Sequence, residues 1–272
     1  MMCESTDNPL VTAIPRVVAL ALILFSVTGC GPRNETRGIH HADRGDGFDN
    51  RPVIRLPGGD WGYPTPYAHY PRGPGGFKMC LLFDSLLERG PDGLLPWLAE
   101  SWEVSDDGWS YRFRIHQEAI WHDGTPLTAA DVVFSLRYAC RHPMVWSHIA
   151  SDDIKAVRAI DSRTVTVEAN QPAASLLYRL GRTRILPRQI WESVESPRDF
   201  RDKRSVIGSG PFRLTDYDRA QGIYRFEAFS GFRGPKPAVT AIEFVPVSQE
   251  ILAFENGAID LAHVPPDLLP RY

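Results

Sequence analysis

The stretch of sequence that decides the fold runs from Trp97 to Ala139 and reads WLAESWEVSDDGWSYRFRIHQEAIWHDGTPLTAADVVFSLRYA. In its middle, four apolar side chains alternate with polar ones, which is the period-two pattern of a strand with one buried face. These four are Trp109, Tyr111, Phe113 and Ile115. Asp106-Asp107-Gly108 precedes them and predicts a tight turn, because Gly accepts the positive φ that such turns need. The stretch therefore predicts a β-hairpin.

Helices are predicted on both sides of this hairpin. Leu98 and Trp102 lie four residues apart, a helical spacing that predicts a short helix before it. After a second turn at 122–126, Thr128 and Asp131 form a capping-box variant in which Asp replaces the usual Glu or Gln, and a second helix is predicted to begin there. The apolar stripe of that helix is Val132, Val133, Leu136 and Ala139.

The rest of the chain is a succession of predicted strands and helices. Strands are predicted at 53–56, 154–160, 164–168, 212–216, 224–228 and 242–247. Helices are predicted at 77–88, 172–180, 189–194 and 248–256. Strands and helices distributed along the whole chain in this way predict an α/β fold.

The composition limits the kinds of partner. The chain has 272 residues, of which 43% are hydrophobic, and this is enough to bury a sizeable core in one large domain or two smaller ones. A net charge of −3 gives no basic surface and argues against a nucleic-acid partner. Two cysteines lie in apolar helical contexts, Cys80 and Cys140. We interpret them as buried thiols, and a disulfide between them is the alternative.

Three blocks of sequence together resemble one protein family. They are PWLAESWEVSDDGWSYRFRI at 96–115, WHDGTPLTAADVVFSL at 121–136 and IGSGPFRL at 207–214. In this order they resemble the extracellular solute-binding proteins of family 5, the peptide- and nickel-binding proteins that serve ABC importers, and the resemblance covers roughly 53–260. It implies an α/β, periplasmic-binding-protein-like fold of the two-lobe type (type II), of which this chain is expected to hold an incomplete first lobe.

The N-terminal segment is predicted to be a lipoprotein signal peptide at 1–29. Arg16 provides a positive flank, and 17–27 is an apolar run that is short for a membrane span. The run ends in VTGC, which resembles a lipobox and makes Cys30 the expected lipidation site. Two acyl chains suffice for stable anchoring on the periplasmic or cell-surface side of the cytoplasmic membrane. The alternatives are an ordinary signal peptide and an uncleaved anchor.

The remaining chain is predicted to fall into three parts. Residues 30–50 are polar, without apolar periodicity, and are expected to be a flexible tether. The resemblance implies that 51–247 is the first lobe and that 248–272 is the truncated start of the interlobe crossing or second lobe.

The resemblance also implies ligand-binding residues. It places the aromatic loop after the first strand in the ligand cleft, with Trp61 and Tyr70 as candidates, although such rings can also pack the loop onto the domain. Trp146 falls where family members hold an aromatic ring over the solute, with core packing as the alternative. Arg184 falls at a cleft arginine of nickel-chelate-binding relatives and would clamp a carboxylate, with an exposed surface charge as the alternative. Ser209 lies in the turn beside the cleft.

Nothing in the sequence predicts an enzyme, a cofactor or a metal site. The carboxylate pairs at 106–107 and 152–153 lie in predicted turns, where Asp caps backbone donors. No G-x-S-x-G or P-loop motif occurs, and Gly208-Ser209-Gly210 is followed by Pro211 rather than by a helix.

The sequence and the resemblance together predict a solute-binding protein. We expect it to bind oligopeptides and deliver them to the permease and ATPase subunits of an ABC importer, without chemistry of its own. Uptake of nickel or a metal chelate is the alternative within the family. A receptor module that senses solute and a non-functional truncated remnant are alternatives of other kinds.

Overall fold

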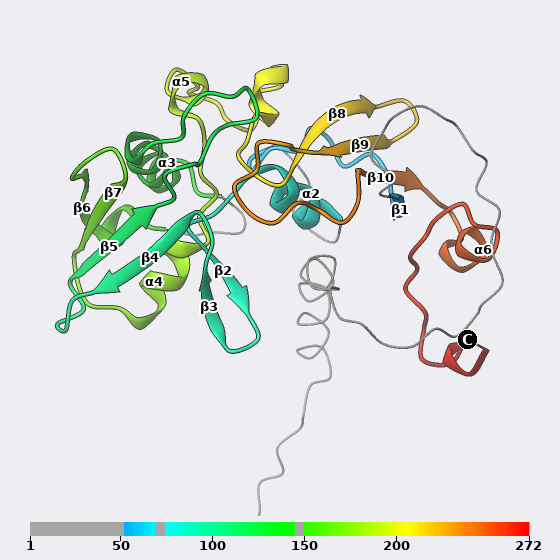
Figure 1. Ribbon diagram of the computed structural model, residues 1–272, viewed down its shortest axis with the longest axis horizontal. Helices are drawn as coiled ribbons and strands as arrows, with labels where there is room; N and C mark the ends of the chain where they lie inside the picture. The colour runs from blue at the N-terminus through cyan, green and yellow to red at the C-terminus, as the bar shows by residue number, and fades with distance from the viewer. Residues whose placement is uncertain (1–51, 69–73, 145–148, 272) are drawn as a thin grey trace, which may run out of the picture.

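A computed structural model describes residues 52–68, 74–144 and 149–271. Within these ranges the chain forms two four-stranded sheets and one two-stranded ribbon (Figure 1). We name the four-stranded sheets the first sheet, β4-β5-β7-β6, and the second sheet, β1-β10-β9-β8. Each sheet has its own cluster of buried apolar side chains.

The first sheet is antiparallel throughout and grows from the predicted hairpin. Its strands are β4 (Ala99–Val104), β5 (Ser110–Ile115), β6 (Ile154–Ala159) and β7 (Thr164–Ala169). The period-two prediction is confirmed for Tyr111, Phe113 and Ile115, which are buried in β5 and alternate with exposed arginines. It is wrong for Trp109, which precedes the strand and is 45% exposed, because it lies next to the turn at the end of the hairpin. The predicted turn at 106–108 joins β4 to β5, and Gly108 has the positive φ of 74°.

Two helices pack on the first sheet, α3 (Ala129–Arg141) and α4 (Ala174–Gly181). The capping box at the start of α3 is confirmed, since the Thr128 N–H donates to the Asp131 carboxylate over 2.8 Å. The other carboxylate oxygen of Asp131 accepts from the Arg188 N–H, 3.0 Å away, at the start of α5 (Arg188–Trp191). One side chain therefore fixes the start of both helices.

The second sheet contains β1 (Val53–Gly58), β8 (Phe212–Asp218), β9 (Ile223–Ala228) and β10 (Ala241–Pro246). Strands β8, β9 and β10 pair as an antiparallel meander, and β1 joins the edge parallel to β10. Its core is rich in aromatic rings, including Tyr224, Phe226 and Phe244. The predicted pairing of the 224–228 and 242–247 strands is confirmed.

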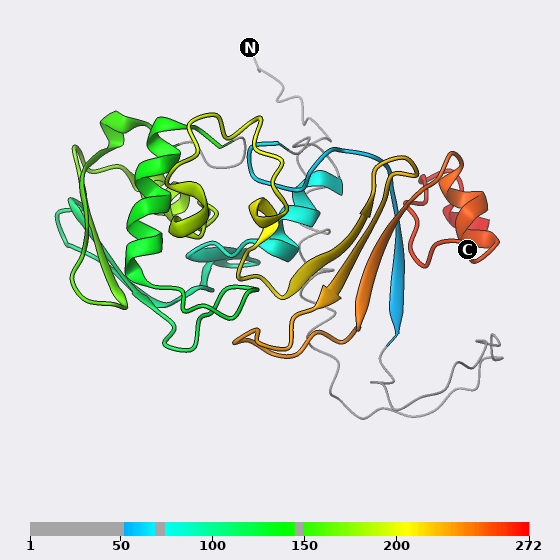
Figure 2. The same ribbon diagram turned by 90° about the horizontal axis from the view of Figure 1, so that it is seen from above.

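The short elements connect the two sheets. Helix α2 (Pro74–Leu82) lies between them (Figure 2), and the ribbon of β2 (Leu87–Gly90) and β3 (Gly93–Pro96) follows it. Helix α6 (Glu250–Glu255) lies beyond β1, on the side of the second sheet away from the first. Three single 3₁₀ turns are Ser151–Asp153, Lys203–Val206 and Leu269–Arg271. In the described ranges, no helix has both the length and the apolar character that a membrane span requires.

One helix prediction is wrong, and a second is wrong in part. Residues 97–102 are not a helix, because β4 begins at Ala99 and Trp102 pairs with Phe113 across the hairpin. The helix predicted at 77–88 ends at Leu82, and the chain then becomes extended and enters β2 at Leu87. In both places long-range strand pairing outweighs a local apolar spacing of four, which on its own is compatible with either structure.

The cysteine interpretation is also partly wrong. Cys80 and Cys140 are free, so the alternative of a disulfide between them is excluded in this structure. Cys80 is nevertheless exposed and Cys140 is half-buried, so the two are not the buried thiols that their apolar neighbours suggested.

The turn at 208–210 approaches the end of α2 more closely than any side chain would allow. A Cβ atom on Gly208 would lie 1.8 Å from the Leu82 carbonyl oxygen, and one on Gly210 would lie 2.4 Å from that of Leu81. The Gly210 N–H donates to the Leu82 carbonyl over 2.9 Å. Glycine is needed here because backbone meets backbone.

We therefore predict that Gly208→Ala destabilises the protein strongly, by about 3 kcal/mol, the upper range for overpacking. Chemical denaturation followed by circular dichroism measures the change. Gly59→Ala is the matched control, because a Cβ there meets nothing nearer than 3.8 Å. Equal effects of the two substitutions would contradict the backbone-contact explanation.

Candidate functional site

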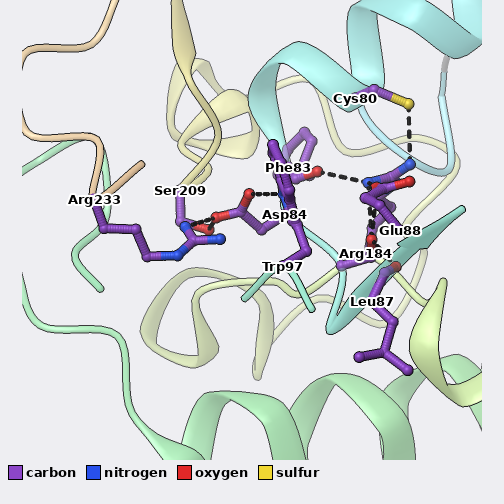
Figure 3. Close-up of polar contacts among 10 residues, drawn as sticks. Cys80, Phe83, Asp84, Leu87, Glu88, Trp97, Arg184, Ser209 and Arg233 are labelled. Atoms are coloured by element: carbon purple, nitrogen blue, oxygen red, sulfur yellow. Dashed lines mark hydrogen bonds and ion pairs between the residues drawn. The ribbon is translucent and has the colours of Figure 1, made fainter. Parts of the chain in front are cut away.

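The segment 83–88, which leads from α2 into β2, carries the buried carboxylate of Asp84 and the partly buried one of Glu88, and the two face opposite ways (Figure 3). Asp84 points toward Ser209 and Arg233, and Glu88 points toward Arg184. We call these side chains and their partners the buried polar network. Its members come from parts of the chain that are far apart in sequence.

Asp84 is the most completely surrounded carboxylate of the network. Its Oδ2 atom accepts from Arg233 Nη1 over 2.6 Å and from Ser209 Oγ over 2.9 Å, while Oδ1 accepts from Trp97 Nε1 over 2.6 Å. The Asp84 side chain is 0% exposed and that of Arg233 is 5% exposed. The Arg233 guanidinium also lies over the rings of Trp97 and Phe232, 5.9 and 5.1 Å from their centroids. These contacts join the 208–210 turn, the β3–β4 connection and the β9–β10 loop.

Arg184 is the centre of the other half of the network. Its Nη1 donates to Glu88 Oε1 over 2.7 Å and to the Phe83 carbonyl over 3.0 Å, and it lies 3.3 Å from Ser85 Oγ. Its Nη2 donates to Cys80 Sγ over 2.9 Å. Burial opposes ionisation of Glu88, but the charge of Arg184 and the hydrogen bond from Ser85 outweigh it and lower the pKa of Glu88.

The 208–210 turn is also held from the other side, by His122. The Gly208 N–H donates to His122 Nδ1 over 3.1 Å, so the proton of the neutral ring lies on Nε2, which donates to the Gly210 carbonyl over 3.0 Å. Burial lowers the pKa of His122 to about 4, which keeps the ring neutral at physiological pH. The predicted turn at 122–126 therefore positions a histidine that fixes the loop carrying Ser209.

Trp61 lies apart from the network, in the loop that leaves β1. Its N–H donates to Tyr224 Oη over 3.0 Å, and the same hydroxyl donates to the Gly62 carbonyl over 2.7 Å. Asp60 accepts from Tyr217 Oη over 2.5 Å. This loop begins at the carboxyl end of β1 beside parallel β10, and the crevice outside the carboxyl ends of parallel strands is where open α/β sheets bind ligands.

The structure brings together only some of the residues that the sequence suggested. Arg184 and Ser209 both belong to the buried polar network, and Trp61 does not. The surface-charge alternative for Arg184 is wrong, because the residue is 7% exposed. Tyr70, Trp146 and Cys30 lie outside the described residues.

Sequence reasoning missed the two residues that form the buried ion pair. Asp84 lies in a stretch that was predicted to be helical, and Arg233 lies in a Gly- and Pro-rich loop 149 residues away. The available signal was a single acidic residue in an apolar run, KMCLLFDSLL, because an isolated carboxylate among apolar residues requires a partner when it is buried.

Comparison with known proteins identifies the family. The model of the bacterial extracellular solute-binding proteins, family 5 (middle region), matches residues 93–272, more than half of the chain. The chain belongs to this family. In the described residues, no cluster of three or more His, Cys, Asp or Glu side chains is arranged to hold a metal ion.

Relatives of known name are peptide-binding components of transporters. The peptide transport periplasmic protein SapA of Salmonella typhimurium is 33% identical over 186 residues, which are 59% of this chain and 33% of SapA. The dipeptide-binding protein of Escherichia coli is 28% identical over 186 residues, 60% of this chain and 35% of that protein. The chain thus matches about a third of the length of these relatives.

Solved structures confirm the fold. NikZ from Campylobacter jejuni in complex with Ni(L-His) has a TM-score of 0.68 at 24% identity, over 81% of this chain and 44% of NikZ. OppA from Haemophilus influenzae in complex with RPPGFSPFR has a TM-score of 0.66 at 20% identity, over 82% of this chain and 48% of OppA. The fold is that of the type II periplasmic binding proteins, as the sequence predicted.

We predict that Asp84→Asn destabilises the protein by about 3 kcal/mol, because it leaves the buried guanidinium of Arg233 without its counter-charge. The double variant Asp84→Asn/Arg233→Met should recover part of this loss, since it removes the unpaired charge. Denaturant titration of both variants measures the coupling. Glu192→Gln, which breaks the exposed pair with Arg188, is the control and should change stability by less than about 0.5 kcal/mol. An equally stable Asp84→Asn protein would contradict the assignment.

Proposed function

We propose that this chain is part of an extracytoplasmic solute-binding protein that captures oligopeptides and delivers them to an ABC permease. The observation that supports this most directly is the family match over residues 93–272. Relatives that cover 59% and 60% of the chain are named for peptide transport and for dipeptide binding. The protein would perform no chemistry, and the partner ATPase would supply the energy for transport.

The proposed ligand surface is the carboxyl edge of the β1–β10 pair. Trp61 leaves β1 at this edge, and we propose that it contacts the solute together with Tyr70 and Trp146. Extended peptides are recognised largely through main-chain hydrogen bonds, with aromatic walls that tolerate different side chains. Main-chain hydrogen bonds together with aromatic walls would suit a protein that carries peptides of varied sequence.

We assign Arg184 and Ser209 a supporting part in this binding. The Arg184 guanidinium already binds Glu88, and the Ser209 hydroxyl already binds Asp84. A solute carboxylate would have to displace Glu88 from a buried ion pair in order to reach Arg184. We therefore propose that both residues act through the buried polar network, which holds the segments around the binding surface in place.

The domain organisation and the anchor are part of the same proposal. Residues 51–247 would form the first lobe and 248–272 the start of the crossing to the second. Cys30 would carry the lipid that anchors the protein at the outer face of the cytoplasmic membrane, with 30–50 as the tether.

We predict that short peptides raise the melting temperature of the protein, because a ligand that binds the native state alone stabilises it by mass action. Thermal-shift measurements with di- to pentapeptides and with nickel–histidine compare the two solute classes. Trp61→Ala should weaken peptide binding about tenfold, as expected when an aromatic contact residue is removed. Trp109→Ala, at an exposed hairpin, is the control and should leave binding unchanged. A shift with nickel–histidine alone would replace peptides by metal chelates as the solute class.

We predict that Cys30→Ala releases the protein from membranes, because the lipobox position of the variant has no thiol to acylate. Fractionation of cells that express the wild-type and variant chains measures this release. Cys140→Ala is the control and should leave the distribution unchanged. Retention of the Cys30→Ala chain in the membrane fraction would rule out the lipid anchor.

A further inference from the structure

Lys78 is a buried lysine that the binding function described so far does not use. It lies on α2, and its residue exposure is 0%. Its Nζ atom is 3.5 Å from the centroid of the Tyr224 ring and 4.7 Å from that of Phe244. The Gly59 carbonyl oxygen lies 3.5 Å from Nζ, at the outer limit of a hydrogen bond. The ammonium group is therefore held mainly by aromatic faces.

An ammonium group in this position is unfavourable for stability. Burial disfavours its charge and lowers the pKa of Lys78 to about 7, although the negative charge of Asp60 partly opposes this shift. A methionine would fill similar space between the same rings without any charge to desolvate. Stability alone thus gives no reason for a lysine here, and a role in positioning is the physical alternative.

Two of the contacts of Lys78 connect it to one loop, residues 59–62, which we name the Trp61 loop. Lys78 binds the Gly59 carbonyl at the start of this loop. The Tyr224 ring under the ammonium carries the hydroxyl that accepts from the Trp61 N–H and donates to the Gly62 carbonyl. Lys78 and Tyr224 together therefore fix both ends of the loop at the carboxyl edge of β1.

We propose that Lys78 is a positioning residue that holds the Trp61 loop in the conformation that receives the solute. Its ammonium does this through the cation–π contact with Tyr224 and the bond to Gly59. The inference rests on the proposed function in so far as Trp61 is taken to contact solute. The effect of Lys78 on the conformation of the loop does not depend on that assumption.

The other titratable groups around Lys78 keep their charge state near neutral pH. The hydroxyl of Tyr217 lowers the pKa of Asp60, which stays ionised. Burial raises the pKa values of Tyr217 and Tyr224, which stay neutral. Arg219 is highly exposed, with its Nε 4.0 Å from Asp60 Oδ2. In this described cluster, Lys78 is the group whose charge changes around pH 7.

The lowered pKa of Lys78 makes both the free energy of unfolding and the conformation of the Trp61 loop depend on pH. The pKa of a lysine side chain is ordinarily 10.5, and burial lowers that of Lys78 to about 7 in the folded protein, so folding favours its neutral form. The free energy of unfolding should therefore fall as the pH decreases from 10.5 to 7, and this contribution should level off below 7. The Trp61 loop should instead open more readily as the pH rises above 7. The reason is that the cation–π contact with Tyr224 weakens when the Lys78 ammonium loses its proton.

Amide hydrogen exchange at the Trp61 N–H tests the positioning role directly, at pH 6 and pH 8.5, with correction for the intrinsic exchange rate. The wild-type protein should protect this amide at pH 6 and lose much of the protection at pH 8.5. Lys78→Met should give low protection at both pH values, and Lys78→Arg, which keeps its charge, should restore it at both. Lys155→Met, which removes an exposed lysine on β6, should behave as the wild type.

A second measurement separates positioning from a merely structural role. At pH 6, Lys78→Met should have a higher melting temperature than the wild type and yet bind tri-alanine about tenfold more weakly. If Lys78 had a merely structural role, Lys78→Met would lower both the melting temperature and the affinity for tri-alanine. Full Trp61 protection in Lys78→Met, or an unchanged pH dependence of exchange, would overturn the inference. If the wild type binds no peptide, the proposed function fails, while the exchange data still decide the role of Lys78.

Discussion

The buried carboxylate of Asp84 is the constraint on which the arrangement of this protein depends. A carboxylate inside an apolar core is tolerated only when charged or polar donors replace the water that it has lost. Arg233, Trp97 and Ser209 provide these donors from three different connections, with distances of 2.6 to 2.9 Å. Because all three must reach one side chain, the two sheets, α2 and the β9–β10 loop are held in a single relative placement. The packing of apolar side chains alone is far less directional.

A network that is already satisfied also limits where solute can bind. The resemblance to nickel-chelate-binding relatives predicts that Arg184 binds a solute carboxylate. Its guanidinium is instead hydrogen-bonded to Glu88, to the Phe83 carbonyl, to the Ser85 hydroxyl and to the Cys80 thiol. Such a group stabilises its surroundings more readily than it exchanges partners, since an exchange would leave the partly buried Glu88 without its positive partner. We propose the carboxyl edge of the β1–β10 pair instead, because open α/β sheets bind ligands outside the carboxyl ends of parallel strands.

At this edge, stability conflicts with the binding role that we propose for the Trp61 loop. The Trp61 loop is held by hydroxyl groups and by a buried ammonium that folding alone would not favour. Binding sites are commonly kept in an arrangement that the rest of the fold has to support, because a preorganised loop loses less entropy when solute arrives. The aromatic core of the second sheet provides that support, with Tyr217 and Tyr224 stacked at 4.4 Å between centroids.

The sequence alone determined the elements whose pattern is local. Strand β5 followed from strict alternation, the start of α3 followed from Thr128 and Asp131, and the turn at 106–108 followed from its glycine. The family and the fold class followed from the order of three motifs. Only the tertiary structure decided that 97–102 is a strand, that β1 pairs parallel to β10, and that Asp84 meets Arg233 from 149 residues away. The reason is physical: local patterns fix φ and ψ within a few residues, whereas strand partners and buried ion pairs depend on which distant segments the whole fold brings together.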